Sequence, residues 1–324
     1  MPTAGVDYPK DTSEFDRWFP SEDTCYEYVA KVKWPSGFDC RFCGGSHGWK
    51  IGRGRIKCRD CRKESTVTSG TLFQDTRKPL RDWLAAMWYI TNQKNGTSAL
   101  GLQRALGFGS YTTAWLWLHK FRRAMVRPGR EKLSGRVEID ETYIGGEAVG
   151  KPGRGSLKKA LVIVAVQKNK KGIGRIRLRR ILDASSASLM DFAQQTVEQG
   201  STIHTDGWRG YSGLRSHGFQ HEVSVLSDAG PTGAKELLPR VHLVASLVKR
   251  WILGTHQGSV SPEHIDYYLD EFTFRFNRRT SKSRGMLFYR LVEQAVSSSP
   301  IVSNEIYGGK EILPPQPIVV GGVN

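Results

Sequence analysis

The sequence lacks any apolar stretch of roughly 18 residues, the length at which a helix could span a bilayer. Residues 1–15 contain no apolar run and no small-residue cleavage pattern, so they do not have the form of a secretion signal. No internal repeat is evident. We therefore expect a cytoplasmic protein with no membrane partner.

Acidic residues are scarce relative to basic ones. Asp and Glu number 31 against 48 Lys and Arg, which gives a net charge of +17 and a pI near 9.8. Such an excess is unusual for a metabolic enzyme and typical of a protein that binds a polyanion. Nucleic acid is the leading partner class, and the protein is expected to associate with the nucleoid. A length of 324 residues allows two or three domains.

Cysteine is also rare, and four of the five cysteines stand in two Cys-x-x-Cys pairs. They are Cys40, Cys43, Cys58 and Cys61, with residues 44–57 between the pairs. Two such turns supply the four thiolates of a tetrahedral zinc shell. A disulfide is disfavoured in a cytosolic chain, and a redox dithiol needs only one pair. The sequence predicts a zinc ribbon with one structural Zn²⁺ ion, whose four thiolates leave no position open for catalysis.

The residues before the ribbon predict a short helix. Residues 21–31 have Ser21 or Thr24 as the cap, and Cys25 and Val29 lie on the apolar side. Cys25 is expected to be a buried small hydrophobic residue and not a fifth ligand.

A helical pattern covers residues 80–125. It is interrupted by the turn Gly-Phe-Gly-Ser at residues 107–110, after which the last helix carries Arg122 and Arg123. A helix, a glycine-containing turn and a basic second helix suggest a helix-turn-helix segment that binds DNA. Many helical hairpins only pack, and the Trp and Leu positions here are expected to be core.

Acidic residues then follow two predicted strands. Residues 137–139 predict a short strand that ends at Asp140 and Glu141, and residues 201–205 predict a strand that ends at Asp206. Residues 160–167 and 175–182 predict the other strands of a meander, and residues 186–197 predict a helix. Glu138 and Glu141 could instead face solvent, with Asp140 capping a turn. Two acids at two strand ends nevertheless suit divalent cations, which take oxygen ligands from separate elements.

A later helix offers a third group. Pro239 fits the first helical position, and apolar residues recur on one face after it. At about 100° per residue His242 and Lys249, two turns apart, lie together at the border of this face. By themselves they could be a satisfied histidine and a solvated charge.

Four longer motifs together resemble the DDE transposases. They are Asp-Glu-Thr-Tyr-Ile-Gly-Gly at residues 140–146, Thr-Asp-Gly-Trp-Arg-Gly-Tyr at 205–211, Ser-Leu-Val-Lys-Arg at 246–250 and Tyr-Leu-Asp-Glu-Phe-Thr-Phe-Arg-Phe-Asn-Arg-Arg at 268–279. More narrowly, the chain resembles the bacterial insertion-sequence group that carries an N-terminal zinc ribbon. The resemblance extends from about Cys40 to Arg279. It implies a multidomain α/β protein with a ribonuclease-H-like catalytic domain, which cuts transposon ends and joins their 3′-hydroxyls to target DNA.

The resemblance also implies the roles of individual residues. Asp140 and Asp206 match the first two acids of the family and His242 stands where the third, a Glu, is usual, so these three are expected to hold two Mg²⁺ or Mn²⁺ ions. Lys249 is expected to contact a phosphate near the scissile bond. Glu236 is the nearest acidic alternative, but it precedes Pro239. Because imidazole suits Mn²⁺ better than Mg²⁺, Mn²⁺ is expected to support activity at least as well.

Two or more copies of the chain are expected to bind DNA together. Further basic residues are candidates for contact with this DNA. They are Arg122, Arg123, Lys249, Arg250, Arg275, Arg278 and Arg279. Residues 145–151 imitate a phosphate loop, but Pro152 replaces the required Ser or Thr, so nucleotide binding is rejected. Residues 151–159 are expected to form a basic loop.

The expected division of the chain has four parts. They are an N-terminal helix and zinc ribbon at residues 1–78, a helical DNA-binding segment at 79–130, the catalytic domain at 131–296 and a C-terminal tail at 297–324. Two alternatives remain open. One is a zinc-ribbon DNA-binding regulator whose catalytic domain is inactive, and the other is a structure-specific nuclease of the same fold that cuts without joining.

Overall fold

The computed structural model describes residues 1–127, 129–145, 159–170, 172–225, 237–258 and 260–309. Most of the predicted basic loop, Glu236 and residues 310–324 of the predicted tail lie outside these ranges. The chain forms two compact units. The first contains Met1–Pro128 and Thr280–Gly308, and the second contains Gly129–Arg279. Within the described ranges, no helix combines the length and apolar character needed to cross a membrane.

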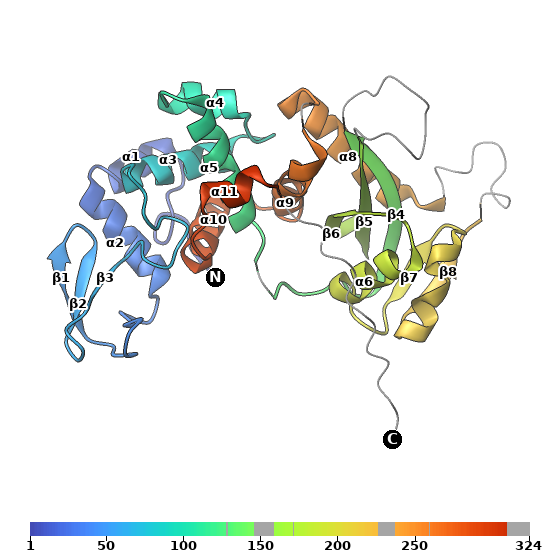
Figure 1. Ribbon diagram of the computed structural model, residues 1–324, viewed down its shortest axis with the longest axis horizontal. Helices are drawn as coiled ribbons and strands as arrows, with labels where there is room; N and C mark the ends of the chain where they lie inside the picture. Colours follow the sequence, from blue (N-terminus) through green and yellow to red (C-terminus); the bar gives the residue numbers. More distant parts are fainter. Residues whose placement is uncertain (128, 146–158, 171, 226–236, 259, 310–324) are drawn as a thin grey trace. The chain divides into compact units, whose positions relative to one another are not determined.

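Helices and one small sheet make up the first unit (Figure 1). Its helices are α1 (Thr12–Trp18), α2 (Glu22–Lys33), α3 (Leu80–Asn92), α4 (Ala99–Leu106), α5 (Tyr111–Ala124), α10 (Gly285–Ser297) and α11 (Ser303–Tyr307), and its strands are β1 (Gly48–Gly52), β2 (Arg55–Cys58) and β3 (Glu64–Thr66). The strands form an antiparallel sheet in the order β1-β2-β3. Ser21 caps α2 in a reciprocal capping box with Thr24, which confirms the predicted helix start.

Phe288 of α10 is fully buried among aromatic rings that come from the beginning of the chain. Its ring meets Phe15 and Trp88 edge-on at centroid distances of 5.9 and 5.5 Å, and it stacks with Tyr28 at 6.1 Å. Aromatic pairs in these geometries stabilise a core beyond the area that they bury. The helix near the end of the chain therefore completes a core that the first 90 residues begin.

This packing differs from the expected division of the chain. The sequence suggested that residues up to 296 belong to the catalytic domain, whereas α10 belongs to the first unit. The expected boundary near residue 78 also has no counterpart, because Glu22 accepts hydrogen bonds from the backbone N–H groups of Leu80 and Arg81 at 2.5 and 3.1 Å. Contacts between residues so far apart in sequence leave no local pattern, so composition and periodicity could not assign these helices.

The predicted helix, turn and helix are present in the first unit. α4 ends at Leu106, Gly107 adopts a left-handed conformation (φ 65°) that glycine tolerates without strain, and α5 begins at Tyr111. Trp83 of α3 stacks on Trp117 of α5 at 3.8 Å, and both are buried. Trp83, Trp88 and Trp117 thus form core as expected, whereas Trp115 is only partly buried, and contact of the segment with DNA stays a prediction.

The second unit is built on a five-stranded mixed sheet. Its strands are β4 (Arg136–Gly145), β5 (Lys159–Asn169), β6 (Gly172–Ile181), β7 (Thr202–Thr205) and β8 (Gln220–Val223), and its helices are α6 (Ser186–Thr196), η1 (Arg209–His217), α8 (Pro239–His256), η3 (Pro262–His264) and α9 (Ile265–Phe276). The strand order is β6-β5-β4-β7-β8. The first three strands form the predicted antiparallel meander, and β7 and β8 continue the sheet in parallel.

Strand β4 is longer than predicted. The sequence suggested that it ends at the acidic pair, but β4 pairs with β5 without interruption from Val137 to Gly145, so Asp140 lies in the middle of the strand. Thr142, Tyr143 and Ile144 are β-branched or aromatic residues, and these favour extended backbone. The second prediction was right, because β7 ends at Thr205, immediately before Asp206.

The sheet separates two hydrophobic cores. Val162, Val164 and Val166 of β5 pack with α8 and α9 on one face, while Ile163 and Ala165 pack with α6 and η1 on the other. Figure 1 shows α6 and α8 on opposite sides of the sheet. Successive residues of a strand point to opposite faces, so Glu138 and Asp140 lie on the face covered by α8.

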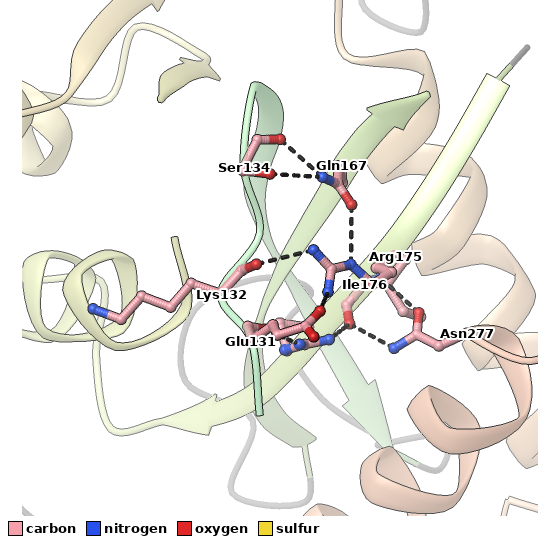
Figure 2. A network of polar contacts seen from close by, with 8 residues as sticks. Glu131, Lys132, Ser134, Gln167, Arg175, Ile176 and Asn277 are labelled. Carbon is pink, nitrogen blue, oxygen red and sulfur yellow. Dashed lines mark hydrogen bonds and ion pairs between the residues drawn. The ribbon is translucent and has the colours of Figure 1, made fainter. Parts of the chain in front are cut away.

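Helix α9 covers the outer edge of β6. The side chain of Asn277 accepts a hydrogen bond from the backbone N–H of Ile176 at 2.7 Å and donates one to its carbonyl at 3.2 Å, and Figure 2 shows the two residues side by side. The amide thus takes the place of a neighbouring strand. Unpaired edge strands promote association with other chains, so this contact protects the sheet.

Arg175 ties the segment before β4 to the sheet. Its guanidinium donates to Gln167 at 3.2 Å, to the carboxylate of Glu131 at 2.7 Å and to the backbone carbonyl of Lys132 at 3.0 Å, and Gln167 in turn donates to the carbonyl of Ser134 at 2.9 Å (Figure 2). These contacts hold the chain at the start of β4, and with it the register that places Asp140.

Candidate active site

Asp140 and Asp206 lie at the same level on neighbouring parallel strands. Glu138 of β4 pairs with His204 of β7, and each aspartate follows two residues later, Asp140 within β4 and Asp206 directly after the end of β7. Asp140 accepts a hydrogen bond from the backbone N–H of Glu141 at 2.8 Å, and Asp206 accepts one from the backbone N–H of Trp208 at 3.0 Å. The sheet therefore brings together the two acids that the sequence singled out.

His242 lies beside Asp140. It occupies the first turn of α8, and its Nε2 atom is 3.2 Å from Oδ2 of Asp140. Burial raises the pKa of Asp140 above its ordinary value, and the nearby charge of Asp206 acts in the same direction. The N–H of Glu141 and the imidazole of His242 oppose this rise. Three predicted groups thus meet at one place, two of them in direct contact.

A buried carboxylate sets the position of α8 over β4. Glu138 is only 2% exposed, and one of its oxygens accepts the backbone N–H groups of Arg240 and Val241 at 2.8 and 3.0 Å. Its other oxygen accepts from the guanidinium of Arg240 at 2.6 Å. A carboxylate at a helix N-terminus satisfies N–H groups that have no partner within the helix and interacts favourably with the helix dipole. The sequence alone is compatible with a solvent-facing Glu138, and nothing in its local pattern indicates burial.

Lys249 lies two turns after His242 and is exposed. Partial burial of its ammonium group lowers its pKa, and the nearby charge of Lys159 lowers it further, while Asp140 acts in the opposite direction. Lys249 is therefore close enough to both residues to feel their charges. A cation at the edge of an acidic site suits contact with a phosphate.

Glu141 is a further acid at the site. It accepts a hydrogen bond from the hydroxyl of Tyr211 at 2.5 Å. Burial raises its pKa to about 7; the hydroxyl of Tyr211 opposes the rise, and the charges of Asp140 and Asp206 add to it. The sequence suggested no role for Glu141, although its place directly after Asp140 in a strand beside Asp206 was a usable signal.

The acids open into a cleft of about 810 Å³ in the second unit. It is lined by Asp140, Glu141, Tyr143, Lys159, Ala160, Leu161, Arg180, Ile181, Leu182, Asp183, Ala184, Ser185, Asp206, Trp208 and Pro262. His242 and Lys249 are not among these lining residues. Lys159 does line the cleft, and its charge acts on Lys249.

The chemistry of the donor groups suits a divalent cation. The charge of Asp206 helps to raise the pKa of Asp140, so a cation near both carboxylates is favourable, and an imidazole in contact with Asp140 adds a nitrogen ligand. The three groups are nevertheless not drawn tightly together. Among the described residues, the four ribbon cysteines are the only set of three or more such ligands whose atoms all lie within 4.8 Å of one another.

The four predicted zinc ligands form this cluster in the first unit. The sulfur of Cys40 is 3.6 Å from that of Cys61, and the sulfur of Cys43 is 3.7 Å from that of Cys58. Zn–S bonds of 2.3 Å in a tetrahedron place sulfurs about 3.8 Å apart, whereas a disulfide needs about 2.05 Å. The cluster therefore fits zinc, and all the cysteines are free thiols. Cys25 is fully buried, as expected.

The predicted DNA-binding arginines have different surroundings. Arg122 is only 1% exposed, so its position does not agree with a predicted surface contact. Its place at the end of a basic helix suggested exposure, but Arg122 lies on the face of α5 that is buried. Arg123 is exposed and pairs with Glu305 at 3.0 Å, and Arg250 is exposed on α8.

The arginines at the end of α9 make contacts within the second unit. Arg275 pairs with the buried carboxylate of Glu271 at 2.8 Å, and Arg278 lies over the ring of Phe274 at 4.0 Å. Arg279 is exposed and donates to the carbonyls of Gly174 and Ile173 in β6. The arginines at the end of α9 therefore have a packing role, part of which is contact with the edge of the sheet.

Two family descriptions match the chain. "ISXO2-like transposase domain" matches residues 132–277, and "transposase zinc-ribbon domain" matches residues 20–64. The first range contains Asp140, Asp206 and His242, and the second contains the four cysteines. The chain is also similar to an uncharacterised protein in the transposable element ISH50 of Halobacterium salinarum, at 27% identity over 275 residues, which are 79% of this chain and 91% of that protein.

Likeness to solved structures is low. The catalytic core domain of BIV integrase is 15% identical with a TM-score of 0.31, and the match covers 47% of this chain and 89% of that chain. A pre-cleavage Mos1 transpososome is 15% identical with a TM-score of 0.25, and the match covers 69% of this chain and 79% of that chain. At these TM-scores the likeness carries no argument about the fold or chemistry of this chain.

Proposed function

Because the chain belongs to the ISXO2-like transposases that carry an N-terminal zinc ribbon, we propose that it binds the terminal inverted repeats of a mobile DNA element, cuts the DNA there and joins the freed 3′-hydroxyl to target DNA. The observation that supports this proposal is that Asp140 of β4 and Asp206, directly after the neighbouring strand β7, line one cleft, with Nε2 of His242 at 3.2 Å from Oδ2 of Asp140. We take the second unit to be ribonuclease-H-like, and its strand order of three antiparallel and two parallel strands supports this assignment.

Asp140, Asp206 and His242 are the groups that would hold two divalent cations, Mg²⁺ or Mn²⁺. When bound, such ions supply activation of the attacking oxygen and stabilisation of the leaving oxygen in an in-line displacement. The described residues contribute the positions of the ligands. The pairing of β4 with β7 sets the two carboxylates, and the contact of Glu138 with the start of α8 sets His242 over Asp140.

Phosphoryl transfer depends mainly on positioning and on stabilisation of charge. Lys249, whose charge interacts with those of Asp140 and Lys159, is proposed to bind a phosphate next to the scissile bond. The net charge of +17 favours the DNA backbone as ligand, and Arg123 and Arg250 are exposed cations that can contribute. Arg275, Arg278 and Arg279 would contact DNA only in addition to the packing contacts that they already make.

The zinc ribbon is proposed to have a structural role. Four thiolates complete a tetrahedral shell, so a Zn²⁺ ion there has no open position for a substrate. We further propose that two or more copies of the chain act together on the two ends of the element, and that the protein works in the cytoplasm at the nucleoid.

A joining assay tests the function. DNA carrying a pre-cut transposon end with a free 3′-hydroxyl is incubated with the protein, a target plasmid and Mn²⁺, and joined products are expected. Cleavage of an uncut end without any joined product would instead support a nuclease of the same fold. Specific binding to the end without cleavage or joining would support an inactive DNA-binding regulator.

A further inference from the structure

A large aromatic side chain lies exposed at the wall of the cleft. Trp208 is 39% exposed and lines the cleft together with Asp140 and Asp206, and Leu182, which is 64% exposed, lines it as well. Clefts that bind ligands are typically lined by aromatic and apolar side chains together with a few polar or charged groups, and Trp208 and Leu182 beside the two acids have this character. This apolar surface is not explained by metal binding or by contact with a phosphate.

The structure fixes the indole in place. Its Nε1 donates a hydrogen bond to the backbone carbonyl of Ala184 at 2.9 Å, and the backbone N–H of Trp208 donates to Oδ1 of Asp206 at 3.0 Å. The same residue is therefore tied to the loop before α6 and to one of the two acids. A ligand that stacks on the indole must therefore lie close to Asp206.

Gly210 leaves room for the ring. A Cβ atom at this position would lie 2.5 Å from Nε1 of Trp208 and 2.8 Å from Cδ1 of Leu189. The edge of the indole thus rests on backbone that has no side chain, and any larger residue at 210 would displace it. The site is built so that the ring keeps one orientation.

The surroundings indicate which ligand fits. Lys159 lines the same cleft, so a phosphate can bind near an apolar planar surface; Arg180 lines it as well, but its guanidinium pairs with Asp266 at 3.0 Å. A nucleotide combines these two chemistries, because every base has a π-face that stacks on an aromatic side chain. At an uncut transposon end both faces of each base are covered by its neighbours in the duplex. A base of such an end that stacks on Trp208 must therefore be unpaired.

We propose that Trp208 is a stacking platform for one unpaired nucleobase of the DNA end, next to the scissile phosphate. This inference rests on the proposed function, and it names the form of DNA that the site takes: a duplex whose terminal pair is open. Enzymes that act on a displaced base must meet the cost of unpairing it, and stacking on an aromatic side chain offsets part of that cost.

Two DNA ends and three variants test the proposal. One end is fully paired, and the other carries a mismatch at the terminal pair, so that its base is already unpaired. Trp208→Leu removes the π-face, Trp208→Phe keeps one, and Gly210→Ala displaces the indole without removing it. Trp49→Leu is the matched control, because Trp49 is 37% exposed but lies in β1 of the first unit.

The ratio of cleavage rates on the two ends is the readout. Trp208→Leu is expected to slow cleavage of the paired end by about 5- to 140-fold more than cleavage of the mismatched end, which corresponds to stacking of ~1–3 kcal/mol at tenfold per 1.4 kcal/mol. Gly210→Ala should act in the same direction, Trp208→Phe should recover most of the rate, and Trp49→Leu should leave the ratio unchanged. An equal loss on both ends would mean that Trp208 only supports Asp206, and the proposal would be overturned.

A second readout needs no cleavage and no divalent cation. The unpaired base of the mismatched end is replaced by 2-aminopurine, whose fluorescence falls when the base stacks. The complex with wild-type protein should be dimmer than the complex with Trp208→Leu, and equal brightness would contradict stacking. If wild-type protein neither binds nor cleaves these ends, the proposed function itself fails, whereas binding and cleavage with an unchanged ratio and equal brightness refute this inference alone.

Discussion

The contact of Glu138 with the start of α8 should control catalysis, although Glu138 is not itself expected to touch DNA or a cation. It lies two residues before Asp140 on the same face of β4, and its partners Arg240 and Val241 directly precede His242. In Glu138→Gln, the amide oxygen can still accept both backbone N–H groups. Its NH₂ group then meets the guanidinium of Arg240, so the substitution removes the ion pair and leaves two donors facing each other.

The size of the effect follows from burial. Glu138 is 2% exposed, while the side chain of Arg240 is 28% exposed and can regain water. A hydrogen bond to a charged group contributes about 1.5–3 kcal/mol, so we expect Glu138→Gln to lower the free energy of unfolding by about 1–3 kcal/mol. Displacement of the first turn of α8 by about 1 Å can cost on the order of 10²-fold in rate. We therefore expect cleavage to fall by about 10- to 100-fold.

Three measurements on purified protein check this prediction. They are urea unfolding, a mobility shift on end DNA, and cleavage of the same DNA over a range of Mn²⁺ concentrations. Cleavage should fall and need more Mn²⁺, while DNA affinity stays within about threefold. Arg240→Gln is the matched control, because it removes the same ion pair but keeps both backbone contacts of Glu138; it should cost a similar ~1.5–3 kcal/mol of stability but much less activity. If Glu138→Gln cleaves the DNA at the wild-type rate at every Mn²⁺ concentration, the reasoning is refuted.

Three further outcomes are expected. Asp140→Asn and Asp206→Asn should each abolish cleavage while a mobility shift gives nearly the wild-type DNA affinity, because each keeps its shape and loses only a ligand charge; loss of binding together with cleavage would point to a structural role for the acids. Mn²⁺ should support strand transfer at least as well as Mg²⁺, since one ligand is an imidazole; faster transfer with Mg²⁺ at all concentrations would contradict His242 as a ligand. Metal analysis should find one zinc per chain, lost in Cys58→Ser, and iodoacetamide at pH 8 should leave Cys25 unmodified in the folded protein, because burial raises its pKa to about 12.

The sequence by itself determined the parts of the molecule whose chemistry depends on near neighbours. Two Cys-x-x-Cys turns specify a zinc shell because each turn brings its own two sulfurs together. Pro239 at the first helical position and the spacing of Val241, Val244 and Val248 specify α8, since an apolar face repeats at the period of a helix. The longer motifs around Asp140 and Asp206 specified the family.

Only the tertiary structure decided which distant residues share a core or a site. Phe288 packs in the aromatic core of the first unit, Arg122 is buried, and Glu138 accepts a hydrogen bond from the backbone N–H of Arg240 at the start of α8. None of these features has a local pattern in the sequence. The physical reason is that burial is a property of pairs of surfaces. A helix or strand shows in its own sequence that it has an apolar or acidic face, but the element that will cover that face is chosen only when the whole chain packs.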